Sequence, residues 1–383
     1  MIRKERWLNA VWIRNLLRRR RLALTAAAAW GLLLISTACG GISGSSSSGS
    51  APLRIALITP AGAGELAQAI RLGAEAAAKE SGAALVAVEA YPPAQPTSGS
   101  AVSDKVGTGA DASRAKGHAV SADTGMLTLE EREQAQIEAV ARALKQGASA
   151  LIVDPMSEHA LTEMVRQAAE SGAAGTAVPV IVLNDEFPVE GIASVISIDH
   201  EDAGRQAGEA MAELLHGSGT VVLLGSDPLN HPGLARREQG IMEALGSYPE
   251  IEVLPAISCG TREECGQKTA RMLDRNPVNG IIALQEMASL GAADELNRRE
   301  SAAEVNVVAF GSEQQQLAQL QEGVFQQLIV QNGFSAGYLG LNQAVARLRG
   351  GQTQTRVTLE TKLVGTDNMF WMDNQKLLFP FVQ

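Results

Sequence analysis

The feature of this sequence that most limits its fold is a repeated alternation of short apolar runs with amphipathic stretches. Apolar runs such as residues 53–59, 151–153 and 220–224 are typical of buried parallel strands. Each is followed by residues in which apolar side chains recur at helical spacing. The alternation continues to residues 305–309, which is more strands than one sheet is expected to hold. It therefore predicts an α/β chain with two doubly wound parallel sheets, each covered by helices on both faces.

Local signals mark where some of these helices begin and end. Thr128 is followed three residues later by Glu131, which is the pattern of a capping box. Gly147 stands where a helix usually ends, and Ser157 is suited to cap the next helix. A later helix is expected from about Ala203 to Leu215. Residues 92–125, which precede Thr128, have neither helical nor strand periodicity and are rich in Ser, Gly, Ala and Asp. This composition predicts a disordered insert.

The N-terminal residues have the pattern of an export signal. Residues 1–21 hold eight basic residues and one acid, and an uncharged run of 14 residues follows at 22–35. This run is shorter than the ~20 apolar residues of an ordinary transmembrane helix. Residues 36–40 resemble a bacterial lipobox, although Ser36 stands where Leu is usual. We therefore expect a lipoprotein signal peptide at 1–38, a lipidated Cys39 and a Gly/Ser-rich tether at 39–52, with a conventional cleaved signal or a short anchor as the alternative.

Charge and cysteine usage narrow the classes of function. Beyond residue 21 the chain holds 24 Lys and Arg against 41 Asp and Glu, so it repels phosphate backbones and is not expected to bind nucleic acid. Cys259 and Cys265 are the remaining cysteines, expected at the end of a strand and at the start of a helix. Outside the cytoplasm they form either a disulfide or two free, partly buried thiols. The spacing is not Cys-x-x-Cys, and the five histidines have no metal-ligand spacing, so neither redox catalysis nor a metal is expected. Each histidine is expected at the surface or at a helix end.

Several short segments, taken in order, resemble one known family. They are ALIVDP at 150–155, PVIVLN at 179–184, REQG at 237–240 and VVAFG at 307–311. From residue 53 onward the order of elements resembles the type I (ribose-type) periplasmic solute-binding proteins of ABC transporters. The resemblance implies two Rossmann-like lobes joined by a three-crossing hinge. Lobe one would be 53–198 plus 332–361, and lobe two 199–331 plus 362–383.

The resemblance also implies which residues face the ligand. Arg237 falls where the family has a ligand-contacting Arg, and Gln331 matches a family Gln at a hinge crossing. Gln285 and Asp154 each stand where the family usually has Asn. Each of these could instead only cap a helix, hold a hinge or lie on the surface. Where the family has Asp followed by Arg, this chain has Asn184 followed by Asp185. A pentose site is therefore not preserved, and the first lobe is expected to present a more anionic side. The predicted ligand-binding residues are Asp154, Asn184, Asp185, Arg237, Gln285 and Gln331.

Binding rather than catalysis is the expected function. The sequence has no Gly-x-Ser-x-Gly elbow, phosphate-binding loop or His-Glu-x-x-His motif. We expect a monomer without a cofactor, anchored outside the cytoplasm to the cell membrane. It is expected to bind a small polar, sugar-like molecule and to deliver that molecule to an ABC permease. The alternative is a receptor that presents its ligand to a membrane sensor kinase or chemoreceptor. The aromatic tail after Thr366 runs past the usual end of the family, and it either packs along a lobe or forms a docking surface.

Overall fold

A computed structural model describes residues 52–62, 64–91, 128–172, 176–227 and 231–378. The predicted signal peptide, Cys39 and the predicted insert at 92–125 lie outside these residues. The described chain forms two six-stranded sheets, each with its own helices.

The first sheet has the order β11-β5-β4-β3-β1-β2, and all of its neighbouring strands run parallel. Its central strands are buried on both faces, which is why they are continuous apolar runs in the sequence. The strands are β1 (Arg54–Pro60), β2 (Ala84–Ala90), β3 (Ala150–Val153), β4 (Val180–Leu183), β5 (Ile192–Ile198) and β11 (Arg356–Leu359).

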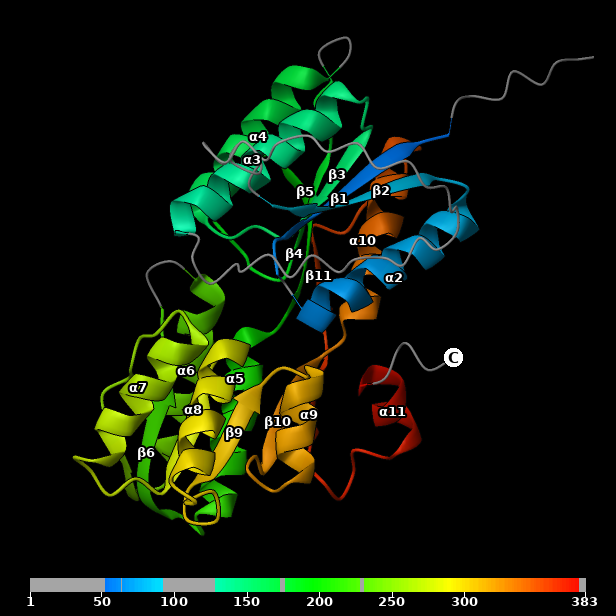
Figure 1. Ribbon diagram of the computed structural model, residues 1–383. Helices are drawn as coiled ribbons and strands as arrows, with labels where there is room; N and C mark the ends of the chain where they lie inside the picture. The colour runs from blue at the N-terminus through cyan, green and yellow to red at the C-terminus, as the bar shows by residue number, and fades with distance from the viewer. Residues whose placement is uncertain (1–51, 63, 92–127, 173–175, 228–230, 379–383) are drawn as a thin grey trace, which may run out of the picture. The chain divides into compact units, whose positions relative to one another are not determined.

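Helices cover both faces of this sheet (Figure 1). One face carries α2 (Gly64–Ser81) and α10 (Gly333–Leu348), and the other carries α3 (Leu129–Lys145) and α4 (Glu158–Ser171). The contact of α2 with α10 is very close, because a Cβ atom on Gly337 would lie 1.8 Å from the Ile70 carbonyl oxygen. Only glycine permits this approach.

The second sheet has the order β12-β10-β9-β8-β6-β7. Its pairings are parallel except at one edge, where β12 runs antiparallel to β10. The strands are β6 (Ser218–Leu224), β7 (Glu250–Val253), β8 (Gly280–Ala283), β9 (Asn306–Phe310), β10 (Gln327–Gln331) and β12 (Thr361–Val364).

The second sheet is also covered on both faces. Helices α5 (His200–Leu214) and α6 (Pro232–Leu245) pack on one face around one apolar core. The other face carries α7 (Arg262–Leu273), α8 (Glu286–Arg298), α9 (Gln314–Gln321) and α11 (Met372–Leu378).

The chain passes between the two sheets three times. It crosses between β5 and α5, between β10 and α10, and again between β11 and β12, where Leu359 and Thr361 belong to different sheets. The structure thus confirms the predicted fold, two parallel-sheet α/β lobes joined by three crossings. In such sheets the ligand-facing residues lie beyond the carboxyl ends of the strands.

Helix boundaries follow the local signals closely. The Thr128 hydroxyl and the Glu131 carboxylate form the predicted capping box, and Gly147 has a φ of 82° just after α3. One boundary was predicted wrongly, because α5 begins at His200 and not near residue 203. The cause is Asp199, whose carboxylate accepts a hydrogen bond from the Asp202 backbone N–H at 3.0 Å and so caps the helix earlier.

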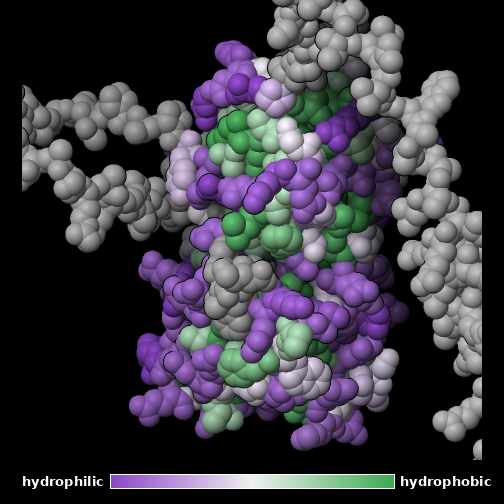
Figure 2. Space-filling model, turned by 90° about the vertical axis from the view of Figure 1, so that its right-hand side faces the viewer, coloured by the Kyte–Doolittle hydropathy of each residue, from purple (hydrophilic) through white to green (hydrophobic). Residues whose placement is uncertain are grey.

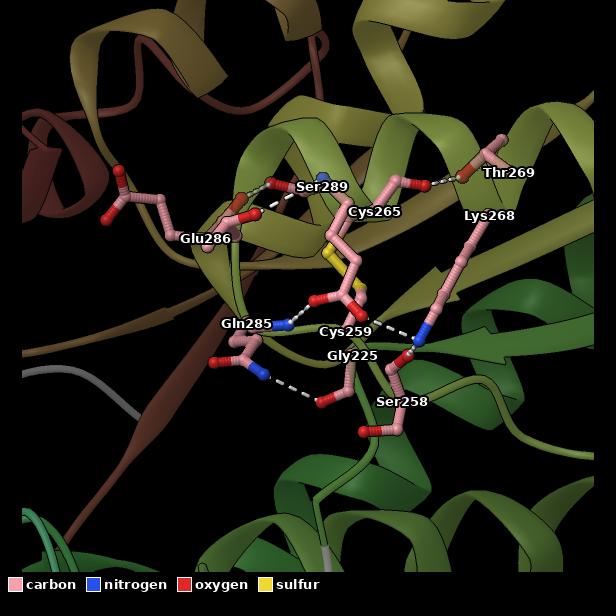
Figure 3. Close-up of a disulfide and its surroundings, with 12 residues drawn as sticks. Gly225, Ser258, Cys259, Cys265, Lys268, Thr269, Gln285, Glu286 and Ser289 are labelled. Carbon is pink, nitrogen blue, oxygen red and sulfur yellow. Dashed lines mark hydrogen bonds and ion pairs between the residues drawn. A yellow bond between two sulfur atoms is a disulfide. The ribbon is translucent and has the colours of Figure 1, made fainter. Parts of the chain in front are cut away.

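Cys259 and Cys265 form a disulfide (Figure 3). The expectation that Cys259 ends a strand is wrong, because β7 ends at Val253 and Cys259 lies in the loop before α7. Pro255 follows closely and cannot donate to a strand ladder. Both cysteines are buried, so the bond fixes this loop to the helix that follows it.

The C-terminal tail is divided between the core and the surface. Met369 and Leu378 are buried in the apolar core of lobe two, whereas Phe370, Trp371 and Met372 are 59%, 65% and 71% exposed. Figure 2 views the molecule from the right-hand side of Figure 1, and on that face hydrophobic and hydrophilic residues are mixed. No helix within the described residues has both the length and the apolar character needed to span a membrane.

Candidate functional site

A cavity of about 160 Å³ lies where residues of both lobes and of the crossings meet. Lobe two supplies most of its wall, from the carboxyl ends of strands and the starts of helices. From lobe one comes Leu66, near the start of α2. The lining residues are Leu66, Ile198, Arg237, Gln285, Glu286, Phe310, Gly311, Ser312, Glu313, Gln316, Ile329, Gln331 and Thr361.

Arg237 is the buried cation of this cavity. Its guanidinium carbon lies 4.4 Å from the centre of the Phe310 ring, which is a cation–π arrangement. Its Nε donates to Nδ1 of His200 at 3.2 Å, and its Nη1 donates to the Leu284 carbonyl at 2.6 Å. Burial lowers the pKa of Arg237 to about 10, so the side chain stays charged at neutral pH. Part of the guanidinium is thus held by the protein itself, which fixes its direction.

Two glutamine side chains line the same cavity at strand ends. Gln285 precedes α8, and its Nε2 donates to the Gly225 carbonyl at 2.8 Å (Figure 3). Gln331 ends β10 at the second crossing, where it pairs in register with Thr361 of β12. The cavity therefore brings together Arg237, Gln285 and Gln331 of the six predicted ligand-binding residues.

Two carboxylates of this wall were not predicted from the sequence. Glu286 begins α8, and Glu313 precedes α9. Burial, with the neighbouring charges of Glu313 and Glu65, raises the pKa of Glu286 to about 7. Glu286 is therefore close to half protonated at neutral pH, and can either donate or accept a hydrogen bond. The only signal in the sequence was position, because both residues closely follow predicted strands.

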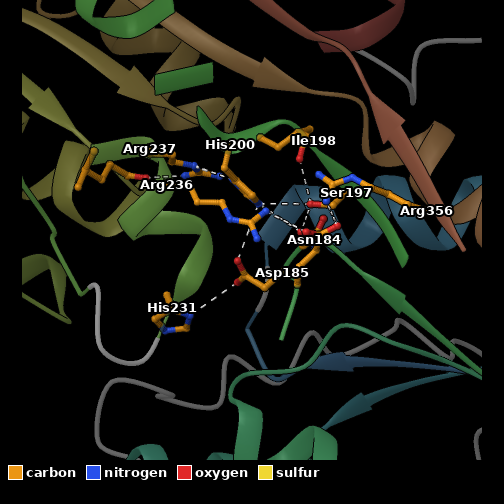
Figure 4. Close-up of polar contacts among 11 residues, drawn as sticks. Asn184, Asp185, Ser197, Ile198, His200, His231, Arg236, Arg237 and Arg356 are labelled. Atoms are coloured by element: carbon orange, nitrogen blue, oxygen red, sulfur yellow. Dashed lines mark hydrogen bonds and ion pairs between the residues drawn. The ribbon is translucent and has the colours of Figure 1, made fainter. Parts of the chain in front are cut away.

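The other predicted residues, Asp154, Asn184 and Asp185, are not among those that line the cavity. They follow β3 and β4 of lobe one. Asp185 faces lobe two instead, with a carboxylate oxygen 3.7 Å from Nδ1 of His231 and another 3.8 Å from Nε2 of His200 (Figure 4). Its negative charge is thus directed at protein groups of the second lobe.

The two aspartates of this group titrate in opposite directions. Burial raises the pKa of Asp154 to about 7, although a hydrogen bond with Asn184 opposes the rise. Burial also acts to raise the pKa of Asp185, but the hydrogen bond with His231 and the charges of His200, His231 and Arg237 outweigh it and leave the pKa lowered. The expected anionic side of lobe one is therefore carried mainly by Asp185, because Asp154 is only partly ionised at neutral pH.

The histidines next to Asp185 were expected to be surface or helix-end residues. His200 does begin α5, but it is only 4% exposed. Because its Nδ1 accepts from Arg237, its Nε2 carries the proton and is directed at the Asn184 carbonyl at 3.2 Å. Burial and the charge of Arg237 lower its pKa to about 4, so it is neutral at pH 7. Sequence spacing could not show this, because His200 and His231 are far apart in the chain and meet only at Asp185.

A second acidic residue of lobe one also contacts lobe two. Glu186 accepts from Nη1 of Arg236 in α6 at 2.8 Å, and it also pairs with Arg356 at the start of β11. Together with Asp185, it makes the loop after β4 a place where the lobes contact each other through charged groups.

The chemistry of the cavity suits hydroxyl groups. A fixed guanidinium, three glutamine amides, two carboxylates and the hydroxyls of Ser312 and Thr361 offer donors and acceptors, and Phe310 offers an apolar ring. The cavity is below the roughly 300–1,000 Å³ of drug-sized sites, which favours a molecule as small as one sugar. Within the described ranges, no group of three or more His, Cys, Asp or Glu side chains is placed to hold a metal ion.

A family model described as a periplasmic binding protein domain matches residues 128–352, which is more than half of the chain. This chain belongs to the periplasmic binding protein domain family. Among curated members, a xylitol-binding protein of Mycolicibacterium smegmatis is 27% identical over 229 residues, covering 59% of this chain and 64% of the relative. A D-apiose import binding protein of Paraburkholderia graminis is 26% identical over 205 residues, covering 52% and 63%. The chain thus spans less than two thirds of either relative.

Solved structures of periplasmic binding proteins share the whole fold. An ABC transporter solute-binding protein of Agrobacterium vitis, bound to α-D-tagatopyranose, has a TM-score of 0.69 at 19% identity, and the match covers 85% of this chain and 99% of that protein. A carbohydrate transporter solute-binding protein of Agrobacterium radiobacter, in complex with D-arabinose, has a TM-score of 0.67 at 19% identity, with 86% and 99% covered. At such identities the likeness establishes the fold.

Proposed function

We propose that this protein is an extracytoplasmic solute-binding protein that captures a small, uncharged, hydroxyl-rich molecule, a sugar or a polyol, and delivers it to an ABC importer. The observation that carries the proposal is the Arg237–Phe310 pair in the cavity. A guanidinium fixed over an aromatic ring presents donors to hydroxyls, beside an apolar surface for the C–H groups of a sugar.

The surrounding residues support an uncharged ligand. Glu286 and Glu313 line the cavity with Arg237, so an anionic sugar phosphate or sugar acid would meet carboxylates at close range. Hydroxyls suit this set because each can donate to a carboxylate and accept from an amide or a guanidinium. Xylitol and D-apiose, for which the two curated relatives are named, are uncharged hydroxyl-rich molecules of this class.

Hinged lobes explain how such a site binds and then releases its ligand. Three short crossings let two rigid lobes rotate, and closing them removes water from the ligand. The sequence contains no Gly-x-Ser-x-Gly elbow, phosphate-binding loop or His-Glu-x-x-His motif, and we propose that the protein is not an enzyme. Delivery to an importer is supported by the name of the D-apiose relative and by the structural relatives described as transporter proteins.

A thermal-shift screen tests the ligand class. The panel is xylitol, D-apiose, D-arabinose, D-tagatose and D-fucose, with D-arabinose 5-phosphate and D-glucuronate as anionic controls. A ligand present at 100 times its dissociation constant should stabilise the protein by about 2.7 kcal/mol. At least one uncharged member should raise the melting temperature in a concentration-dependent way, and the anions should not. A panel without any stabiliser, or one in which only the anions act, contradicts the proposal.

We also propose that the chain is anchored to the membrane through a lipid on Cys39. The support is the basic, apolar and lipobox-like order of residues 1–40. Mass spectrometry of the protein purified from membranes of its native host should find a diacylated Cys39 as the first residue. A mature chain that begins elsewhere, without a lipid, would contradict this proposal and leave the ligand proposal untouched.

A further inference from the structure

Two helices that belong to different lobes meet at their N-terminal ends. Helix α2 of lobe one begins at Gly64, and α9 of lobe two begins at Gln314, preceded by Glu313. The Glu313 carboxylate Oε1 accepts a hydrogen bond from the Glu65 backbone N–H at 2.6 Å, and the Leu66 N–H is 3.4 Å from the same oxygen. A carboxylate of lobe two therefore caps the first turn of a lobe-one helix.

A corresponding contact joins the Glu65 carboxylate of lobe one to the N-terminus of α9 in lobe two. Burial raises the pKa of Glu65, and the backbone amide of Gln314, the first residue of α9, opposes that rise by stabilising the charged carboxylate. Each helix thus offers its free N-terminal amides to a glutamate of the other lobe. The approach is close enough that a Cβ atom on Gly64 would lie 2.5 Å from Oε1 of Glu313. Gly64 also has a φ of +64°, so glycine is favoured there for both reasons.

The contact is favourable on both sides for the same physical reason. The first backbone N–H groups of a helix have no partner within the helix, and the N-terminus carries partial positive charge that attracts carboxylates. When the lobes separate, both helix ends lose this partner, and water must replace it. Burial and the like charge of Glu65 raise the pKa of Glu313, and the backbone amides of Glu65 and Leu66 act against that rise by stabilising its charged form.

We propose that Glu65 and Glu313 form a reciprocal latch that holds the two lobes in the closed arrangement. The latch sets the balance between open and closed protein, and through that balance the apparent affinity, because a ligand that needs closed lobes binds in proportion to the closed fraction. Glu65 and Glu313 are positioning residues in this role.

The two glutamates differ in a way that makes the proposal testable. Glu313 lines the ligand cavity, whereas Glu65 is not among the residues that line it. A change at Glu65 therefore alters closure without removing a cavity group. The effect on affinity rests on the proposed binding function, but the effect on lobe closure does not, so closure is measured first and without any sugar.

The experiment compares Glu65→Ala, Glu313→Ala and the double variant by small-angle X-ray scattering of protein without added sugar. Glu322→Ala is the matched control, because Glu322 caps the other end of α9 and is exposed. Glu65→Ala removes only the carboxylate that faces the Gln314 amide, and Glu313→Ala removes only the carboxylate that accepts from the amides of residues 65 and 66. Each single variant should therefore increase the radius of gyration, and the double variant should increase it further. Circular dichroism confirms that each variant is folded.

Glutamine variants separate the hydrogen bond from the charge. Glu65→Gln keeps an acceptor oxygen and should restore part of the closure lost in Glu65→Ala. If neither alanine variant changes the radius of gyration, or if the control changes it as much, the latch is overturned.

Sugar affinity is the second measurement. If the lobes of Glu65→Ala do open, a sugar from the panel should bind this variant several-fold more weakly than it binds wild type. Unchanged affinity together with an open Glu65→Ala variant would show that closure does not set affinity, and would also overturn the latch.

Discussion

The two lobes contribute to the site in different ways. Lobe two provides most of the cavity wall, including the buried Arg237–Phe310 pair, Gln285 and Glu286. In lobe one, the polar residues at the ends of β3 and β4 are not part of that wall, and Asp185 and Glu186 contact cationic or imidazole groups of lobe two. We infer that lobe two recognises the ligand and that lobe one mainly closes over it. Changes in the two lobes should therefore have different effects.

The largest expected effect is in lobe two. Arg237→Ala should weaken binding of the panel sugar at least about 100-fold, about 2.7 kcal/mol, because it removes charged donors from a buried site. Isothermal titration calorimetry measures this. The matched control is the neighbouring Arg236→Ala, which loses only the half-exposed pair with Glu186 and should change affinity little. Equal effects of the two variants would contradict the assignment of recognition to Arg237.

A smaller effect is expected from Glu286, through pH. The folded-state pKa of Glu286 is raised to about 7 from 4.5, so folding disfavours its charged form. Below pH 4.5 this carboxyl is protonated in both the folded and the unfolded protein, and it costs the fold no stability. As the pH rises through about 7, the carboxyl must ionise in its desolvated position, and the folded protein loses stability. Glu286→Gln should therefore stabilise the sugar-free protein by about 1–2 kcal/mol at pH 8, after solvent screening, and by almost nothing at pH 4.

Urea unfolding at the two pH values measures this difference. The control is Glu304→Gln, since Glu304 is exposed in the turn before β9. Equal stabilisation by Glu286→Gln at pH 4 and pH 8 would contradict the raised pKa, and with it the picture of a desolvated wall in lobe two.

The smallest expected effect tests the contacts made by lobe one. The hydrogen bond with Asp185 raises the pKa of His231, so the stability from this pair is present at low pH and is lost as pH rises through that raised pKa. His231→Gln should cost about 0.5–1 kcal/mol at pH 5.5 and less at pH 8.5. Thermal unfolding at both pH values measures it. A cost that does not change with pH would mean that the charge on His231 does not contribute to the pair.

Much of the fold could be predicted from the sequence because its signals are local. Buried parallel strands need continuous apolar runs, and the capping residues Thr128 and Ser157 act within one helical turn. The boundary at His200 was predicted too late, because Asp199 was not recognised as a cap. The three crossings between the lobes came from the resemblance, and strand order and register were not predicted, since no local pattern states which strands are neighbours.

The site could be predicted only in part, for a physical reason. A residue at the end of a strand is known to lie at the ligand edge of the sheet, but its side chain can turn to the cavity or to the other lobe. Arg237 and Gln331 line the cavity, whereas Asp185 turns to His200 and His231. Glu313 was missed because a glutamate before a helix is usually only a local cap. Glu65, which it contacts, is 248 residues away in the chain.

The order in which the chain crosses between the lobes has a consequence for its synthesis. The outer strands β11 and β12, which complete the edges beside β5 and β10, are Arg356–Leu359 and Thr361–Val364. Every other strand has already left the ribosome when these nine residues appear. Until then, the more apolar strands β5 and β10 are the edges of their sheets and can pair with another chain. A protein shortened before residue 356 would therefore lose the edge strands of both lobes at once, and we expect it to aggregate rather than to fold as one intact half.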